Sequence, residues 1–335
     1  MNNLKLTCFI LFLVFFISWI QFQKGTLFSL FEAGLSDFST QVEGESFPKK
    51  LIDKTTIEFI LAKPPTRILS ATLATDHILS DLIDPRRLVA VSSYVDTPSM
   101  SNIVGFYDKS IARTHGEIES MLALQPDLVF VASYSNPETV RYLLRSDIAV
   151  VRMGKSNSFD DIINNITLVA QVTDSEARAE TTIKKLQKRI HVVQQQVKNK
   201  TKLRVLYYDL SGYSVGGNAL MDDAIRLAGG INVAAGIIPD GENKISEEVA
   251  ISLQPDVIVM TQWSFNQGPG EPSPKKILQE KSAWQAVPAV KNDRIYSLPG
   301  RWLRGISQHR ITGVEAMAKL LHPDIKKDQE TSHVR

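Results

Sequence analysis

Short, largely apolar runs alternate along the chain with stretches in which apolar residues recur every three or four positions. The runs lie at residues 67–70, 128–131, 204–208 and 257–260. Each is too short for a helix and is typical of a strand buried on both faces. The stretches between them have the spacing of amphipathic helices. This alternation predicts an α/β fold with mostly parallel sheets.

One helix–turn–strand pattern occurs twice. Residues 119–131 read ESMLALQPDLVFV and residues 248–260 read EVAISLQPDVIVM, with Glu, Leu, Gln, Pro and Asp in the same register 129 positions apart. Each copy predicts a short helix, a Pro-Asp turn and a buried strand. Two chance matches of a common turn are the alternative, but a further strand candidate precedes each copy. We therefore expect two similar α/β lobes.

A long amphipathic helix is predicted between the lobes, with Thr173 and Asp174 as its N-cap residues. Its apolar positions step by three and four: Ile183, Leu186, Ile190, Val193 and Val197. A single helix of about 25 residues is a stiff connection, so large hinge closure is not expected. The expected segments are a signal peptide or anchor (1–24), a polar spacer (25–50), an N-terminal lobe (51–156) that starts with a hairpin, a linking helical segment (157–201), a C-terminal lobe (202–324) and a charged tail (325–335).

The amino terminus predicts export. Residues 6–23 contain no charged side chain and follow Lys5, which is typical of an export signal. As a helix this run would be about 27 Å long, near the lower limit for crossing a bilayer. An uncleaved anchor and a cleaved signal both remain open. We expect a location outside the cytoplasmic membrane, in the periplasm.

Composition narrows the class of function. The 335 residues include 38 Lys and Arg against 36 Asp and Glu, a net charge of +2, which provides no basic field for nucleic acid. The single cysteine, Cys8, lies in the apolar run, so the chain can form neither an internal disulfide nor a Cys-ligated metal site. Two lobes of ordinary composition predict a globular protein, and we expect a monomer.

Several segments carry a resemblance to a known family. They read PPTRILS (64–70), RLVAVSSYVDTP (87–98), the two LQPD blocks, RLAGGINVAAG (226–236) and LHPD (321–324). They resemble the periplasmic binding proteins of ABC importers for iron–siderophore complexes, haem and cobalamin. The resemblance implies two Rossmann-like lobes joined by one long helix, a ligand cleft between the lobes, and a membrane permease with its ATPase as partners. It implies binding rather than catalysis, no resident cofactor, and an iron complex as ligand, with cobalamin and then haem as alternatives.

The same resemblance assigns a role to one glutamate in each repeat. Glu119 and Glu248 take the positions at which the family docks onto permease arginines. Charge-assisted contacts from two carboxylates at a fixed separation suit that role. The alternative is that each is simply an exposed first-turn glutamate favoured by the helix dipole.

Ligand contacts are expected on loops after strands, at the carboxyl ends of the sheets. Arg113 stands six positions before Glu119 and is expected to hold iron-bound oxygens, as an Arg does in the hydroxamate binders of the family. A loop Arg paired with Glu117 is the alternative. The other candidates, each of which can also be a core or rim residue, are Tyr134, Tyr213, Asn218, Trp263, Arg301, Trp302 and Arg304.

Histidine supports no bare metal site. His77 has the spacing of a structural helix residue, and the histidines show no close i, i+4 pairing. His115, beside Arg113, is a candidate ligand for haem or iron. No metal ligand set is predicted.

A serine hydrolase is the alternative from a different class. Residues 212–216 read GYSVG, which matches the G-x-S-x-G elbow and follows a strand. In an elbow the serine leads directly into a helix, whereas after Ser214 the helical pattern starts several residues too late. We therefore expect no enzyme activity and rank Ser214 as a nucleophile second.

Overall fold

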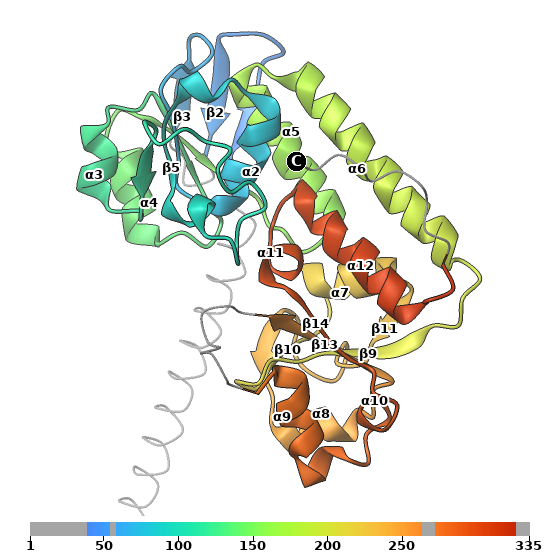
Figure 1. Ribbon diagram of the computed structural model, residues 1–335. Helices are drawn as coiled ribbons and strands as arrows, with labels where there is room; N and C mark the ends of the chain where they lie inside the picture. Colours follow the sequence, from blue (N-terminus) through green and yellow to red (C-terminus); the bar gives the residue numbers. More distant parts are fainter. Residues whose placement is uncertain (1–38, 54–57, 263–271, 326–335) are drawn as a thin grey trace, which may run out of the picture.

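Two parallel sheets organise the structure, one in each lobe (Figure 1). The computed structural model describes residues 39–53, 58–262 and 272–325. The N-lobe sheet has the order β6-β5-β4-β7-β8, with strands β4 (Ile68–Ser70), β5 (Leu88–Ser92), β6 (Ala112–Thr114), β7 (Leu128–Val131) and β8 (Ala149–Arg152). The C-lobe sheet has the order β11-β9-β13-β14, with strands β9 (Leu203–Tyr207), β11 (Gly230–Asn232), β13 (Val257–Gln262) and β14 (Ile295–Pro299). All neighbouring strands in both sheets are parallel, which confirms the predicted fold class.

Helices cover both sheets and connect the lobes. The N-lobe contributes α2 (Leu73–Leu82), η1 (Pro85–Arg87), η2 (Ser93–Asp96), α3 (Ile118–Ala123) and α4 (Pro137–Leu144). The connection consists of α5 (Phe159–Thr173) and α6 (Glu176–Val197). The C-lobe contributes α7 (Leu220–Leu227), α8 (Glu247–Ser252), α9 (Pro274–Glu280), η3 (Ser282–Trp284), α10 (Pro288–Lys291), α11 (Gly300–Leu303), η4 (Gln308–Arg310) and α12 (Ile311–Leu321). A two-stranded antiparallel ribbon of β10 (Tyr213–Val215) and β12 (Glu242–Lys244) completes the C-lobe.

The strands of each lobe alternate between two cores. Leu128 and Phe130 of β7 belong to the largest cluster of buried residues, whereas Val129 belongs to a smaller cluster on the other face of the N-lobe sheet. In β9, Val205 belongs to the same large cluster and Leu206 to a separate C-lobe cluster. The large cluster also contains side chains of the connecting helices and therefore runs continuously from one lobe into the other. Successive side chains of a strand point to opposite faces, so each sheet shares its inner face with the connection.

The sequence repeat is a structural repeat. Its copies fold as α3, a turn and β7, and as α8, a turn and β13. In each copy an arginine near the start of the neighbouring strand in the sheet, β4 or β9, stabilises the turn: Arg67 and Arg204 each donate through a guanidinium nitrogen, at 2.7 and 2.8 Å, to a carbonyl at the end of the short helix. The turn aspartates, Asp127 and Asp256, accept from the backbone N–H groups of these arginines at 2.9 Å. The prediction of two similar units is confirmed at this level.

The linking helix begins later than the N-cap prediction placed it. Thr173 is the last residue of α5, and Asp174 is its C-cap in the left-handed conformation, with φ of 59°. Ser175 is the N-cap of α6, which runs for 22 residues. The N-cap prediction was wrong because two helices, rather than a loop and a helix, meet at this point. In Figure 1, α6 runs along one side of the molecule beside both lobes.

The polar stretch predicted as a spacer through residue 50 contains ordered strands. β1 (Gln41–Glu43), β2 (Lys49–Ile52) and β3 (Glu58–Leu61) form an antiparallel sheet, so the expected hairpin is present and has an additional strand. Residue 40 also joins the N-lobe, since the Thr40 N–H donates to the Arg152 carbonyl at 3.0 Å. The predicted export segment lies outside the described residues, and among the residues described no helix is long and apolar enough to span a membrane.

Candidate functional site

Exposed aromatic side chains follow two strands of the N-lobe sheet. Tyr134 comes after β7 and is 69% exposed, and Tyr94 comes after β5 and is 53% exposed. Both strands are neighbours of β4, so their carboxyl ends lie two strand spacings, or about 10 Å, apart. Ligands of open parallel sheets bind at this edge. Tyr134 was a sequence candidate, whereas Tyr94 was missed although it also lies within three residues of the end of a strand.

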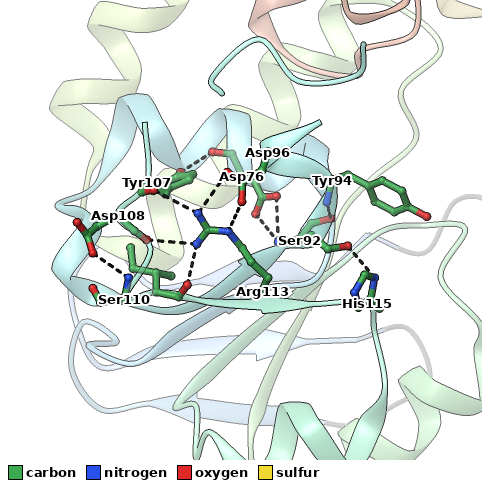
Figure 2. A network of polar contacts seen from close by, with 11 residues as sticks. Asp76, Ser92, Tyr94, Asp96, Tyr107, Asp108, Ser110, Arg113 and His115 are labelled. Carbon is green, nitrogen blue, oxygen red and sulfur yellow. Dashed lines mark hydrogen bonds and ion pairs between the residues drawn. The ribbon is translucent and has the colours of Figure 1, made fainter. Parts of the chain in front are cut away.

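Arg113, the residue expected to hold a ligand, is engaged within the N-lobe. Its Nε donates to Asp96 Oδ2 at 2.7 Å and its Nη2 contacts Asp96 Oδ1 at 3.3 Å (Figure 2). The remaining guanidinium hydrogens point at three backbone carbonyls, at 2.7 to 3.3 Å, in the loop between η2 and β6. A guanidinium has five N–H donors, and all five are used here. In this conformation Arg113 positions the loop and offers no donor to a ligand.

A buried carboxylate fixes the start of the same loop. Asp76 of α2 is fully buried and accepts from the Ser92 N–H, with oxygen distances of 3.1 and 3.3 Å. Burial raises the pKa of Asp76 well above its ordinary value, while the hydrogen bonds oppose that shift. The Tyr107 hydroxyl donates to the Asp76 carbonyl at 2.6 Å (Figure 2). The loop of residues 93–111 is therefore fixed at its start by Asp76, in its middle by Tyr107 and at its end by Arg113.

His115 lies beside this network at the carboxyl end of β6. Its side chain is exposed, and its Nδ1 lies 2.8 Å from the Ser93 hydroxyl (Figure 2). The structure thus places His115 beside Ser93, the residue before Tyr94, and outside the hydrogen-bond network of Arg113. Among the described residues, no group of three or more His, Cys, Asp or Glu side chains is arranged to hold a metal ion.

The C-lobe candidates separate into exposed and packed residues. Tyr213 of β10 is 41% exposed. Arg304 follows α11 and pairs with Glu242 of β12 at 2.7 Å, which connects the β10–β12 ribbon to the end of α11. This contact raises the pKa of Arg304 against the opposing effect of burial, which is the largest single influence. Trp302 is partly buried against the large shared core and so has a packing role.

Two further C-lobe candidates make other contacts or lie in a turn, and a third lies outside the described residues. Arg301 lies over the Trp302 ring at 5.7 Å and donates to the Pro98 carbonyl of the N-lobe at 3.1 Å, so it bridges the lobes. Asn218 is exposed and has a positive φ of 48°, which fits a turn residue. Trp263 lies outside the described residues.

Glu119 and Glu248 occupy equivalent positions in the two copies of the repeat. Each is the second residue of a six-residue helix, α3 or α8, and each is exposed. Hydrogen bonds to its own backbone N–H and to Ser246 lower the pKa of Glu248, so this carboxylate is ionised near neutral pH. The two side chains thus form a matched pair of surface carboxylates, one on each lobe.

Ser214 does not have the geometry of a nucleophile. It is fully buried within β10, and its hydroxyl donates to the Tyr207 carbonyl at 2.7 Å. Gly216 of the same motif is needed for close backbone approach, because a Cβ there would lie 2.0 Å from the Pro239 carbonyl oxygen. The glycines of the G-x-S-x-G match therefore serve chain packing, and the strand–serine–helix turn of an elbow is not formed here.

Comparisons with known proteins agree with this architecture. The model of the periplasmic binding protein family matches residues 68–302. An ABC transporter substrate-binding lipoprotein of Bacillus subtilis is 21% identical over 305 residues, which cover 88% of this chain and 92% of that protein. A cobalamin-binding protein of Halobacterium salinarum is 27% identical over 220 residues, 64% of this chain and 58% of that protein.

A solved structure shows the same fold. Helicobacter pylori CeuE with Ni(II) bound superposes with a TM-score of 0.66 at 20% identity, covering 82% of this chain and 89% of that chain. The two parallel-sheet lobes, the connecting helices and the family match lead to one assignment. The chain belongs to the periplasmic binding protein family and is a substrate-binding protein of the ABC type.

Proposed function

We propose that this protein captures a cobalamin between its lobes and delivers it to an ABC permease and its ATPase. The observation that carries the choice of ligand is the pair of exposed tyrosines, Tyr94 and Tyr134, at the carboxyl ends of strands that flank β4. Aromatic walls suit a large ring system with apolar faces, because ligand sites are mostly apolar with a few polar groups. The similarity to a protein named as cobalamin-binding supports the same choice.

The sequence favoured an iron complex, and the argument rested on Arg113 as an oxygen clamp. The guanidinium of Arg113 is already bound to Asp96 and to loop carbonyls, so it has no N–H left to donate to a ligand. The argument for an iron complex at Arg113 therefore does not apply to this conformation. A ferric chelate is the second candidate ligand, with Arg304 in place of Arg113 as its contact. The Arg304 side chain is 39% exposed in its ion pair with Glu242 and lies at the end of α11, the short helix that follows β14, where an anionic chelate would meet it.

Haem is the third candidate. His115 is exposed, and the hydrogen bond between its Nδ1 and the Ser93 hydroxyl orients the imidazole, as a metal-ligating histidine is commonly oriented by a hydrogen bond to its other ring nitrogen. In all three cases the protein binds and releases its ligand without chemistry.

Delivery would depend on Glu119 and Glu248. One carboxylate on each lobe, at the same position of the same structural unit, gives a partner two fixed points to contact. Arginine is the natural counterpart, since its pairing with carboxylate is directional and charge-assisted. We infer that residues 6–23 direct export of the chain, as a cleaved signal or as an anchor.

The test is a ligand panel on the full chain in a mild non-ionic detergent. Cyanocobalamin, a ferric hydroxamate and haem are compared by thermal unfolding at equal concentration. A ligand at 100 times its Kd adds about 2.7 kcal/mol, which corresponds to a rise in Tm of roughly 5 to 10 °C for lobes of this size. Cyanocobalamin is expected to give the largest rise, and a larger rise with the ferric hydroxamate would overturn the choice of ligand.

Tyrosine variants connect the ligand to the site. Tyr94→Ala and Tyr134→Ala are each expected to raise the Kd for cyanocobalamin at least tenfold, equivalent to about 1.4 kcal/mol. Tyr142→Ala is the matched control, because Tyr142 is a 57% exposed tyrosine of the same lobe on α4. Equal effects of all three substitutions would place the ligand elsewhere.

A further inference from the structure

A large cavity among the described residues lies away from the carboxyl ends of the strands. It has a volume of about 910 Å³ and forms a groove between α6 and α12, which Asp81 of α2 and Gln308 and His309 of η4 also line. Its lining comes from helices only, so it is separate from the proposed ligand site. We call it the α6–α12 groove. On α6 the lining runs from Ala177 to Gln196, which is about 28 Å of helix.

The rim of the groove is positively charged. The cations that line it are Arg178, Lys185, Lys188, Arg189 and Lys319. The two carboxylates that line it are already engaged: Asp81 accepts from Gln308 Nε2 at 2.9 Å, and Glu315 pairs with Arg189 at 2.8 Å. Within the described ranges, Lys185, Lys188 and Lys319 form no ion pair. The groove therefore presents an excess of unneutralised positive charge.

The floor is apolar and one of its walls contains unused polar atoms. Leu186, Val193 and Ile311 form buried parts of the lining. Gln308 is only 6% exposed; its Nε2 donates to the His77 carbonyl at 2.7 Å, which fixes the amide orientation. Its Oε1 has no hydrogen-bond partner in the part of the chain that the structure describes, and the same holds for His309 Nε2. Both atoms are buried beneath the surface, so they offer no accessible contact to a bound molecule.

We propose that the α6–α12 groove binds an acidic peptide segment of a partner protein. Carboxylates of the segment pair with Lys185 and Lys188, and its apolar side chains lie on the floor. A polypeptide can alternate carboxylates with apolar side chains along the whole groove, whose cations on α6 extend from Arg178 to Arg189, whereas a lipid carries its charge at one end of the acyl chain. The groove length fits about eight residues in an extended conformation.

The groove is lined by residues of both lobes and of the helix that connects them. Its lining comes from α2 of the N-lobe, from α6, and from η4 and α12 of the C-lobe. A segment bound along it would contact both lobes and their connection simultaneously. The affinity of the partner would therefore depend on the relative position of the lobes, and its binding would restrict that position.

The probe is a fluorescein-labelled decapeptide in which glutamate alternates with leucine and serine, titrated with the full chain in detergent and followed by fluorescence anisotropy. A peptide with every glutamate replaced by glutamine is expected to bind at least tenfold more weakly. Lys185→Glu combined with Lys188→Glu is expected to raise the Kd at least tenfold. Lys198→Glu combined with Lys202→Glu is the matched control: both lysines are exposed, lie outside the groove and carry the same change in charge, so the Kd should change less than twofold.

Two results would overturn the proposal. Equal weakening by the two double variants, or a Kd above about 1 mM at low salt, would leave only non-specific attraction between opposite charges. Phosphatidylglycerol vesicles provide the second arm. If they bound with the same dependence on Lys185 and Lys188 while the peptide did not, the occupant would be an anionic membrane surface instead of a polypeptide. The cyanocobalamin titration is independent of both outcomes.

Discussion

His77 and Ser307 join the two lobes through one hydrogen bond of 3.0 Å between the imidazole Nδ1 and the serine hydroxyl, across 230 positions of sequence. The other ring nitrogen, Nε2, lies 3.2 Å from the Asn102 N–H, which can only donate. Nε2 is therefore an acceptor, and Nδ1 carries the hydrogen that points at Ser307. This arrangement requires a neutral imidazole in a fully buried position.

Stability is expected to fall in acid because of this histidine. Burial, assisted by the nearby His309, lowers the pKa of His77 to about 3. The unfolded chain takes up a proton near pH 6.5, whereas the folded chain does so only near pH 3, so acid favours unfolding between these values. This single group should lower the free energy of unfolding by about 1.4 kcal/mol for each pH unit in that window, with no effect above it.

Urea unfolding at pH 7, 6, 5 and 4 measures this dependence. His77→Gln removes the titrating group and should be less stable at pH 7 but lose part of the slope below pH 6.5. His191→Gln is the control, since His191 is an exposed histidine on α6. Identical slopes for the wild type and His77→Gln would show that His77 is not the group responsible.

Arg113 and Asp96 are expected to behave as one structural unit. Arg113→Gln and Asp96→Asn should each destabilise the N-lobe by about 1 to 2 kcal/mol, because each removes a charge-assisted contact that holds the loop before β6. The double variant should be little worse than either single variant, since both remove the same interaction. Thermal unfolding measures all three, and strictly additive losses would mean that the two side chains act independently.

Arg113 also shows where the sequence was informative and where it was not. The sequence placed Arg113 on a loop after a strand, six positions before the repeat, whereas it lies within β6, because this three-residue strand (ART) has no apolar run to reveal it. Its partner, Asp96, lies 17 positions earlier, and nothing in the pattern identifies which carboxylate a loop arginine will contact. The lobes and the repeat were predictable because they depend on periodicity and turn residues. Side-chain contacts across loops and lobes depend on tertiary packing, which explains why Gln308, Asn102 and the α6–α12 groove were not foreseen.

The antiparallel sheet of β1, β2 and β3 contains another contact that the sequence did not predict. Lys49 is 2% exposed, and its ammonium donates to the Gln171 carbonyl of α5 and to Glu176 of α6, both at 2.7 Å. A lysine in a stretch of polar residues is consistent with a spacer, but here it fastens β2 to the junction of the two connecting helices. The spacer prediction was wrong at this end because a single buried lysine gives no apolar signal.

Lys49→Met is therefore expected to lower the free energy of unfolding by about 1 to 3 kcal/mol, mainly by leaving the Gln171 carbonyl without its donor. Lys50→Met is a matched control on the same strand, where the lysine makes a surface pair with Glu58 at 2.7 Å. Surface pairs contribute little, so its unfolding midpoint should not change measurably. Chemical unfolding of the two variants compares them directly, and equal losses would contradict the assigned role of Lys49.

Glu119 and Glu248 provide the test of delivery as distinct from capture. Glu119→Arg combined with Glu248→Arg should abolish uptake of radiolabelled ligand by cells while the Kd of the purified chain for that ligand stays within twofold, because opposite charges would be replaced by repulsion at the permease surface. Glu138→Arg combined with Glu180→Arg is the control, since both residues are exposed helix glutamates outside the repeat. Uptake should persist in the control. If the ligand Kd of the first double variant rose in parallel with the loss of uptake, the two glutamates would contribute to ligand binding or to the stability of the fold. Their matched positions would then reflect only the preference of helix N-termini for negative charge.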